Sequence, residues 1–328
     1  VPGPACYGQG GKLASVTDAN VVLGRLSVEH FLGGEMDIDV AAARTAITNG
    51  VGHGLGVDPE HASAGVLRVA VVQMAAAIRL SLFEKGLDPR RFALVSFGGA
   101  GGLHAAEVAT ELGAQKVIYP VEAATLSAWG MLFSDVVHDY AGTRLWRADE
   151  ADLESIQDIT RGLTERALGQ LKSEGFDEAN SRITLMADMR YPGQAYEISI
   201  AWPTPNADAP GLRQAVERFH TEHEAQFAHC ERDTAPQVLT WRVRATGTLP
   251  RPGAPAGMQS SAADGDTGSR TVFLDGERHE LTVFSRAQLR AAGAQSGPTI
   301  VEDSQTTIFI PANWSATTYD DGTVVTEQ

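Results

Sequence analysis

Residues 94–133, LVSFGGAGGLHAAEVATELGAQKVIYPVEAATLSAWGMLF, carry most of the information on how this chain folds. A hydrophobic run at 92–97 predicts a buried strand, and the Gly-Gly-Ala-Gly-Gly turn at 98–102 leads into a helix that begins near Leu103. A second strand is predicted at 116–119, and a helix rich in small residues ends the stretch. Alternating strands and helices indicate an α/β domain.

Two explanations fit the glycine turn, which contains Gly98, Gly99, Gly101 and Gly102. Each glycine costs about 0.5–1 kcal/mol in lost chain entropy, so four of them need a compensating use. One such use is close approach of a ligand to main-chain N–H groups at a helix N-terminus. A tight turn without a ligand fits equally well, because the string lacks the G-x-G-x-x-G spacing and the Lys-Ser/Thr of a P-loop.

The segment after the turn favours the first explanation. The helix ends at Leu112-Gly113, the second strand stops at Pro120, and the small-residue helix contains Gly130. This succession resembles the adenosine-binding end of the superfamily of sugar kinases, actin and heat-shock chaperone ATPases. There a Gly-Gly turn lies against the nucleotide, so the resemblance implies that the four glycines contact adenosine or ribose.

Short motifs along the whole chain resemble the hydantoinase A / 5-oxoprolinase family. They occur in the family's order and are VPGPACYGQGG (1–11), SVTDANVVLGRL (15–26), FLGGEMDID (31–39), FGGAGGLHA (97–105), DMRYPGQAYEI (188–198) and GPTIVEDSQTTIFIP (297–311). The resemblance implies half of an actin-like, ribonuclease H-like ATPase fold. Added helical elements and a small C-terminal β-rich module would complete this α/β architecture.

The resemblance also implies a function. Family members use ATP and Mg²⁺ to open a small cyclic amide such as a hydantoin or 5-oxoproline, or, in acetone carboxylases, to activate a ketone. Phosphorylation would make a carbonyl-derived oxygen a leaving group. A hydantoinase B-like subunit is the expected partner, and a nucleotide-sensing or assembly module without its own chemistry is the alternative from another functional class.

One departure from the family pattern stands out. Family members begin with an Asp/Gly-rich phosphate loop of the D-x-G-G-T kind and carry a second such loop before PGPACYG, whereas this chain opens at Val1 with neither. We therefore expect the C-terminal portion of a longer protein, whose N-terminal half is missing here. Such a portion should not hydrolyse ATP alone.

Composition excludes some partners. The net charge of −15 opposes binding to a phosphate backbone, so no nucleic-acid partner is expected. Residues 62–82 are rich in Ala and Val but contain Arg68, Gln73 and Arg79, which indicates a core helix rather than a membrane span. Cys6 and Cys230 are far apart, as expected for reduced thiols in the cytoplasm.

We predict four segments along the chain. They are a helical and α/β nucleotide-binding lobe at 1–150, an α+β segment at 151–249, a linker or loop at 250–269 and a β-rich module at 270–328. The first lobe should contain helices from 17 or 18 to 26, at 39–51 and at 59–84, closed by glycines. A strand should follow at 136–146, and the second segment should contain helices at 151–174 and 212–227 and strands within 182–202 and at 237–248.

Asp18 and His104 are the candidate catalytic residues, and Asp18 is also the candidate metal ligand. Asp18 lies at a helix start beside the glycine-rich turn at 8–11, where it could organise phosphate or magnesium, or cap the helix for about 1 kcal/mol. His104 lies in the first helical turn after Gly102, where the helix dipole lowers its pKa. The neutral imidazole could act as a base or ligand, or be a structural group.

Two further polar clusters remain open. His220, His223 and His229 suggest a metal site, but the spacing is not H-E-x-x-H, and a solvated helix face also fits. A predicted hairpin carries a dense polar set that could line an interface or serve the structure. The set is Asp188, Arg190, Tyr191, Gln194 and Glu197.

Overall fold

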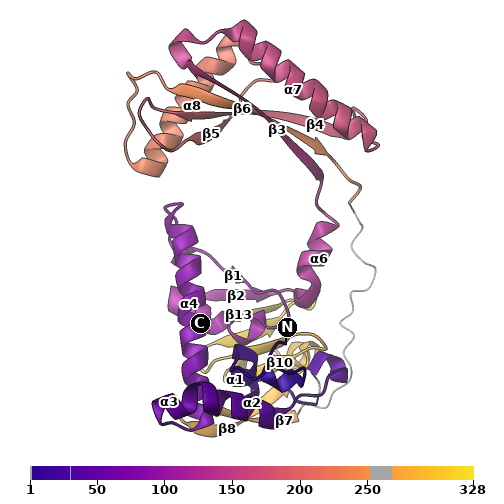
Figure 1. The fold of residues 1–328 in the computed structure, drawn as a ribbon. Helices are drawn as coiled ribbons and strands as arrows, with labels where there is room; N and C mark the ends of the chain where they lie inside the picture. Colours follow the sequence, from indigo (N-terminus) through magenta and orange to yellow (C-terminus); the bar gives the residue numbers. More distant parts are fainter. Residues whose placement is uncertain (1, 30, 252–267) are drawn as a thin grey trace. The chain divides into compact units, whose positions relative to one another are not determined.

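The chain forms two compact units, which a computed structural model describes for residues 2–29, 31–251 and 268–328 (Figure 1). Unit 1 comprises Val1–Gly130 and Gly253–Gln328, and unit 2 comprises Met131–Pro252. Unit 2 is therefore an insertion between the two parts of unit 1. The division differs from the predicted boundaries at 150 and 249, and the described residues begin again at 268, so most of the predicted linker lies outside them.

Unit 1 begins with a series of packed helices. They are α1 (Val16–Val22), α2 (Val40–Ile47), a π-helical turn (Thr48–Gly52), α3 (His53–Leu55) and α4 (Pro59–Phe83). Of these, α1, α2 and α4 are capped by side chains at their first turns. Ser15, not Thr17 or Asp18, is the N-cap of α1, and Asp18 completes a capping box from the third helical position. Asp39 and Asp58 cap α2 and α4.

A five-stranded sheet follows, with strand order β1-β2-β13-β12-β9. Its strands are β1 (Leu94–Val95), β2 (Lys116–Tyr119), β9 (Gln295–Ser296), β12 (Ser315–Thr318) and β13 (Val324–Glu327). Strands β1 and β2 are parallel and flank α5 (Ala105–Leu112), whereas the other neighbours are antiparallel. α6 (Leu126–Met131) ends this part of the chain.

The rest of the C-terminal segment forms a four-stranded sheet of order β11-β10-β8-β7. It contains β7 (Gly268–Leu274), β8 (Glu277–Phe284), β10 (Thr299–Glu302) and β11 (Thr307–Ile310), with α9 (Arg286–Ala292) between β8 and β10. Buried residues of α4, α5, β2, α9, β10, β11 and β12 share one hydrophobic core. Residues 270–328 thus complete unit 1 rather than forming a separate module.

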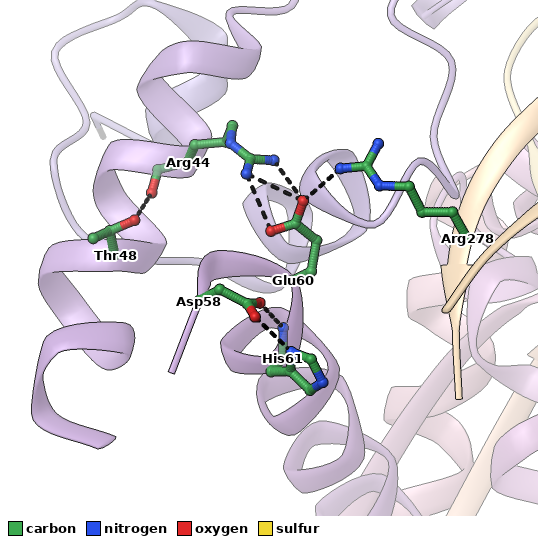
Figure 2. Close-up of polar contacts among 6 residues, drawn as sticks. All are labelled: Arg44, Thr48, Asp58, Glu60, His61 and Arg278. Atoms are coloured by element: carbon green, nitrogen blue, oxygen red, sulfur yellow. Dashed lines mark hydrogen bonds and ion pairs between the residues drawn. The ribbon is translucent and has the colours of Figure 1, made fainter. Parts of the chain in front are cut away.

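An ion-pair cluster joins the first helices to this C-terminal segment, as Figure 2 shows. Glu60, at the start of α4, accepts from Arg44 of α2 at 3.1 Å and from Arg278 of β8 at 2.8 Å. The Asp58 carboxylate accepts a hydrogen bond from the His61 backbone N–H and also pairs with the His61 ring. That ring packs edge-on against Phe273. The cluster therefore fixes the β7–β8 hairpin on the N-terminus of α4.

Unit 2 is a four-stranded antiparallel sheet, of order β3-β6-β4-β5, packed against two helices. Its elements are β3 (Val136–Arg147), α7 (Leu153–Ser173), β4 (Ser181–Arg190), β5 (Ile198–Ala201), α8 (Ala209–Phe227) and β6 (Gln237–Gly247). Alternate residues of β4 and β6 join side chains of α7 and α8 in the core. The predicted helices and strands of this segment are confirmed, with ends shifted by a few residues.

Two expectations about unit 1 were too simple. Only two residues of the predicted buried strand at 92–97 pair, and Phe92 and Phe97 are 44% and 54% exposed. Helix α4 is long and apolar enough to cross a membrane, which is weak evidence because soluble core helices pass the same test. Here α4 buries one stripe, which includes Leu67, Val71 and Ala75, and exposes most of the rest.

The Glu60 cluster gives a stability prediction. We expect Glu60→Gln to lower the free energy of local opening by about 1–2 kcal/mol, because the Glu60 side chain is only 10% exposed and both arginines would lose their partner. Hydrogen exchange of α4 and β8 peptides should then be about 5–30-fold faster. The matched control is Asp158→Asn, whose pair with Arg161 is exposed and should matter little. Equal exchange in both variants would contradict a role for the cluster.

Candidate functional site

A cavity of about 260 Å³ lies beside the glycine turn in unit 1. Its walls come from three stretches distant in sequence, namely the N-terminal segment with α1, the glycine turn, and the loop between β10 and β11. The described residues that line it are Tyr7, Val16, Thr17, Asn20, Leu26, Ser27, Phe31, Leu32, Met36, Gly99, Ala100, Leu103, His104 and 302–307. The turn therefore opens onto a space that a ligand could enter.

The four glycines of the turn have different reasons to be glycine. Gly98 has φ +88°, which side chains rarely adopt. A Cβ on Gly102 would lie 2.5 Å from the carbonyl oxygen of Thr307, so this glycine lets β11 approach, and a Cβ on Gly101 would lie 3.0 Å from the Ser96 hydroxyl. Gly99 is the one of the four that lines the cavity. Backbone geometry therefore accounts for Gly98 and Gly102 without a ligand.

Asp18 is fully buried and does not line the cavity. One carboxylate oxygen accepts from the Cys6 N–H at 2.8 Å, and the other from the Ser15 hydroxyl and N–H and the Ala5 N–H. Burial, and next the hydrogen bond to Asp18, raises the pKa of the Cys6 thiol to about 12, so the thiol stays protonated. These contacts favour the structural alternative, in which Asp18 holds the turn at 5–7 on α1.

His104 is 93% buried beside the cavity and pairs with Asn20 of α1. The Asn20 Nδ2 lies 2.9 Å from the Val16 carbonyl oxygen and 3.3 Å from His104 Nε2. The carbonyl can only accept, which fixes the amide nitrogen at this position. The second amide hydrogen then donates to Nε2, so the ring proton lies on Nδ1.

Both members of this pair keep an unused polar atom. Among the described residues, neither His104 Nδ1 nor Asn20 Oδ1 has a hydrogen-bond partner. Buried polar groups are rarely left unpaired, because an unmade hydrogen bond costs about 1–3 kcal/mol. Both residues line the cavity, so its wall contains a polar pair whose hydrogen bonds are incomplete, although the two atoms themselves are buried.

The environment keeps His104 neutral. Burial lowers its pKa, Glu107 opposes that effect, and Arg25 adds to it. Arg25 is itself buried, forms a bidentate pair with Glu107 at 2.8 and 2.9 Å, and lies over the Phe309 ring. Arg25, which follows α1, thus holds this segment against α5 and β11.

No Lys or Arg side chain is among the described residues that line the cavity. Glu302 and Asp303 are the charged side chains of its described lining, which contains neither Lys nor Arg. Across residues 2–29, 31–251 and 268–328, no group of three or more His, Cys, Asp or Glu side chains is arranged to hold a metal ion. This lining suits a neutral ligand or the neutral part of a charged one, and the magnesium role of Asp18 stays a prediction.

The β10–β11 loop also lines a second, polar cavity of about 160 Å³, with Glu122 and Arg286 on its walls. Arg286 is 2% exposed, donates to the carbonyls of Tyr119, Pro120 and Gly322, and pairs with Asp303. Burial raises the pKa of Asp303, against the lowering effect of Arg286. Sequence reasoning gave this loop no role, although VEDSQTT is among the quoted motifs.

In unit 2, the histidines of α8 are not on a solvated face. His220 and His223 are 4% and 1% exposed. The hydroxyl of Tyr191 lies 2.6 Å from His220 Nδ1, and Gln194 lies 3.0 Å from His223 Nε2. The histidines therefore anchor the Tyr191–Gln194 turn, which supports a structural role for part of the hairpin set.

The rest of that set is also paired inside unit 2. Asp188 bonds Arg242 of β6 at 2.7 Å and the Ser199 hydroxyl, rather than Arg190. Arg190 instead contacts Gln237 and Glu197. An interface role for these residues remains a prediction.

Comparison with known proteins places the chain in a family. The hydantoinase/oxoprolinase family model matches residues 1–140, and the model of the hydantoinase/oxoprolinase C-terminal domain matches residues 147–325. The caprolactamase subunit alpha of Pseudomonas jessenii is 31% identical over 95% of this chain and 46% of its own length. The acetophenone carboxylase gamma subunit of Aromatoleum aromaticum is 29% identical over 95% of this chain and 44% of its own length.

A solved structure shows the same fold. The crystal structure of the ATP-dependent caprolactamase from Pseudomonas jessenii matches 99% of this chain and 48% of its own chain, with a TM-score of 0.80 and 30% identity. The chain thus spans about half the length of these relatives. With matched family models over nearly all of its residues, the chain belongs to the hydantoinase/oxoprolinase family.

Proposed function

We propose that this chain is the C-terminal part of an ATP-dependent cyclic-amide hydrolase subunit, and that the 260 Å³ cavity receives the adenosine end of ATP. The observation that carries the proposal is the cavity wall, where Gly99 and Ala100 lie beside the buried Asn20–His104 pair and the described lining contains neither Lys nor Arg. Apolar side chains such as Leu103 and Phe31 suit an aromatic base. The fold would be one half of an actin-like ATPase.

Each candidate residue of the cavity then has a defined role. The small residues at 99–100 let a nucleoside lie against the turn, and Asn20 and His104 in the lining beside it would offer hydrogen bonds to its polar edge. Asp18 acts as a positioning residue, because it holds the backbone of Ala5 and Cys6, next to Tyr7 in the cavity wall. When bound, ATP would supply the phosphoryl group that turns a carbonyl-derived oxygen into a leaving group.

The phosphates and Mg²⁺ would be held by residues outside this chain. A triphosphate needs cations or helix N-termini, and the acidic described lining of the cavity offers no cation. The relatives named above are subunits, which supports a partner, and we propose a hydantoinase B-like one in a soluble, cytoplasmic complex. A carboxylase-type subunit is the second candidate, favoured by the match to the acetophenone carboxylase subunit.

The activity test compares this chain with the full-length subunit. We expect residues 1–328 alone to release no phosphate from ATP in magnesium and potassium. The full-length subunit with its partner should release phosphate when a lactam, a hydantoin or 5-oxoproline is added. Release that requires a ketone and bicarbonate would favour the carboxylase alternative, and hydrolysis independent of any substrate would favour a nucleotide-sensing module.

A second prediction concerns the cavity. Ala100→Leu should place a larger side chain in it and weaken adenosine or ADP binding by at least about 10-fold, or 1.4 kcal/mol, in isothermal titration calorimetry. The matched control is Ala124→Leu, since Ala124 lines the second cavity. Unchanged affinity in Ala100→Leu, or an equal loss in both variants, would place the nucleotide elsewhere.

A third prediction concerns the protonation of His104. Its folded-state pKa lies below the ordinary 6.5, so between the two values the unfolded chain binds a proton that the folded chain does not. Stability from the neutral ring is therefore fully present above about pH 6.5 and is lost as the pH falls towards the folded pKa. Imidazole ¹⁵N shifts should show a neutral ring with the proton on Nδ1 at pH 7.

The variant His104→Gln serves as the control for that measurement. It should lose the assigned imidazole signal and show a smaller drop in stability below pH 6.5 than the wild type. A charged His104 ring at pH 6.5, or a proton on Nε2, would contradict the arrangement with Asn20.

A further inference from the structure

Leu32, in the short loop at 31–34, has a backbone conformation that leucine rarely adopts. Its φ is 50° and its ψ is 43°, and the next residue, Gly33, has φ 68° and ψ 18°. Two successive left-handed residues form the backbone of a type I′ turn, whose central positions strongly prefer Asn, Asp or Gly. A leucine held there is strained, because its Cβ crowds the following carbonyl oxygen, so its side chain needs a compensating use.

Burial in the hydrophobic core does not supply that use. The neighbouring residues Phe31 and Met36 pack against the core that α1, α2 and α4 share, whereas Leu32 is 45% exposed. A single exposed leucine is ordinary on a protein surface and needs no explanation by itself. On a left-handed backbone it does need one, because glycine would adopt the same conformation without strain.

Leu32 is among the residues that line the 260 Å³ cavity beside the glycine turn. Its loop lies between two walls of that cavity. On one side the centroids of the Phe31 and Tyr7 rings are 5.6 Å apart, and on the other a Cβ on Gly33 would lie 3.9 Å from the Cβ of Ser304 in the β10–β11 loop. Leu32 therefore offers apolar surface at a place where a ligand in the cavity can contact it.

We propose that Leu32 is a binding residue of this cavity, whose side chain packs on the flat face of a heteroaromatic base that lies against the glycine turn. The inference rests on the proposed function, because it takes the adenine of adenosine or ATP as that base. An apolar contact of this kind recognises the base rather than the ribose or the phosphates. The strained backbone is then retained because glycine, which would relieve the strain, would lose the contact.

The test measures stability and affinity together in the full-length subunit. Leu32→Gly relieves the left-handed strain and removes the side chain, so its midpoint of thermal unfolding should be no lower than that of the wild type. In isothermal titration calorimetry it should bind adenosine and ADP at least about 10-fold more weakly, because the lost contact is with the base that both ligands share. Leu32→Asn, which tolerates a left-handed backbone, should weaken both ligands as well.

The matched control is Ala228→Gly. Ala228 is the C-cap of α8 in unit 2 and has φ 61°, so this substitution also relieves a left-handed backbone. Ala228 is not among the described residues that line the cavity. The control should therefore bind adenosine and ADP with the affinities of the wild type.

Several results would overturn the role of Leu32 while leaving the proposed function intact. Wild-type affinity in Leu32→Gly would remove the contact, and a loss for ADP but not for adenosine would place the loop at the phosphates. An equal loss in Ala228→Gly would attribute the effect to strain, and a lower unfolding midpoint in Leu32→Gly would make Leu32 a structural residue. A wild-type subunit that binds neither adenosine nor ADP would instead refute the proposed function, and this inference with it.

Discussion

Unit 1 is organised around a buried cation, the guanidinium of Arg286, which is 2% exposed. Its donors reach the carbonyls at the end of β2 and in the β12–β13 turn, and it pairs with Asp303 in the β10–β11 loop. A buried charge is costly unless it is paired and hydrogen-bonded, so these segments must come together for the arginine to be tolerated. The loop that walls both cavities is thereby tied to the first sheet.

This constraint explains why the cavity is assembled from distant stretches. Gly102 lets β11 approach the glycine turn, and the Arg25–Glu107 pair holds α1 against α5. Asp18 in turn fixes the N-terminal turn on α1. Each wall of the cavity is thus held by a buried polar contact that spans many residues, and the same contacts leave Asn20 and His104 side by side.

The sequence predicted the elements that local patterns specify. Helix α4 and strand β2 were placed almost to the residue, because caps, periodicity and flanking Gly or Pro mark their ends. Helix α9 was missed because its buried residues include Arg286, whose partners lie far along the chain. Sequence patterns also missed the insertion of unit 2 and the roles of Gly102 and the α8 histidines. These features depend on contacts between residues far apart in sequence, which no local pattern reveals.

The charges of the described cavity lining bear on the proposed function, in which this chain supplies one part of an ATPase site. The carboxylates of the described lining are paired with arginines, Glu302 with Arg270 and Asp303 with Arg286, so these cations are already engaged, and the chain's net charge of −15 opposes binding of a polyanion. Under the proposed function, positive charge for the phosphates would come from another surface close to the cavity. In that proposal, recognition of the neutral nucleoside and neutralisation of its phosphates fall to different parts of one polypeptide, because burial of apolar surface can bind the base without any charge.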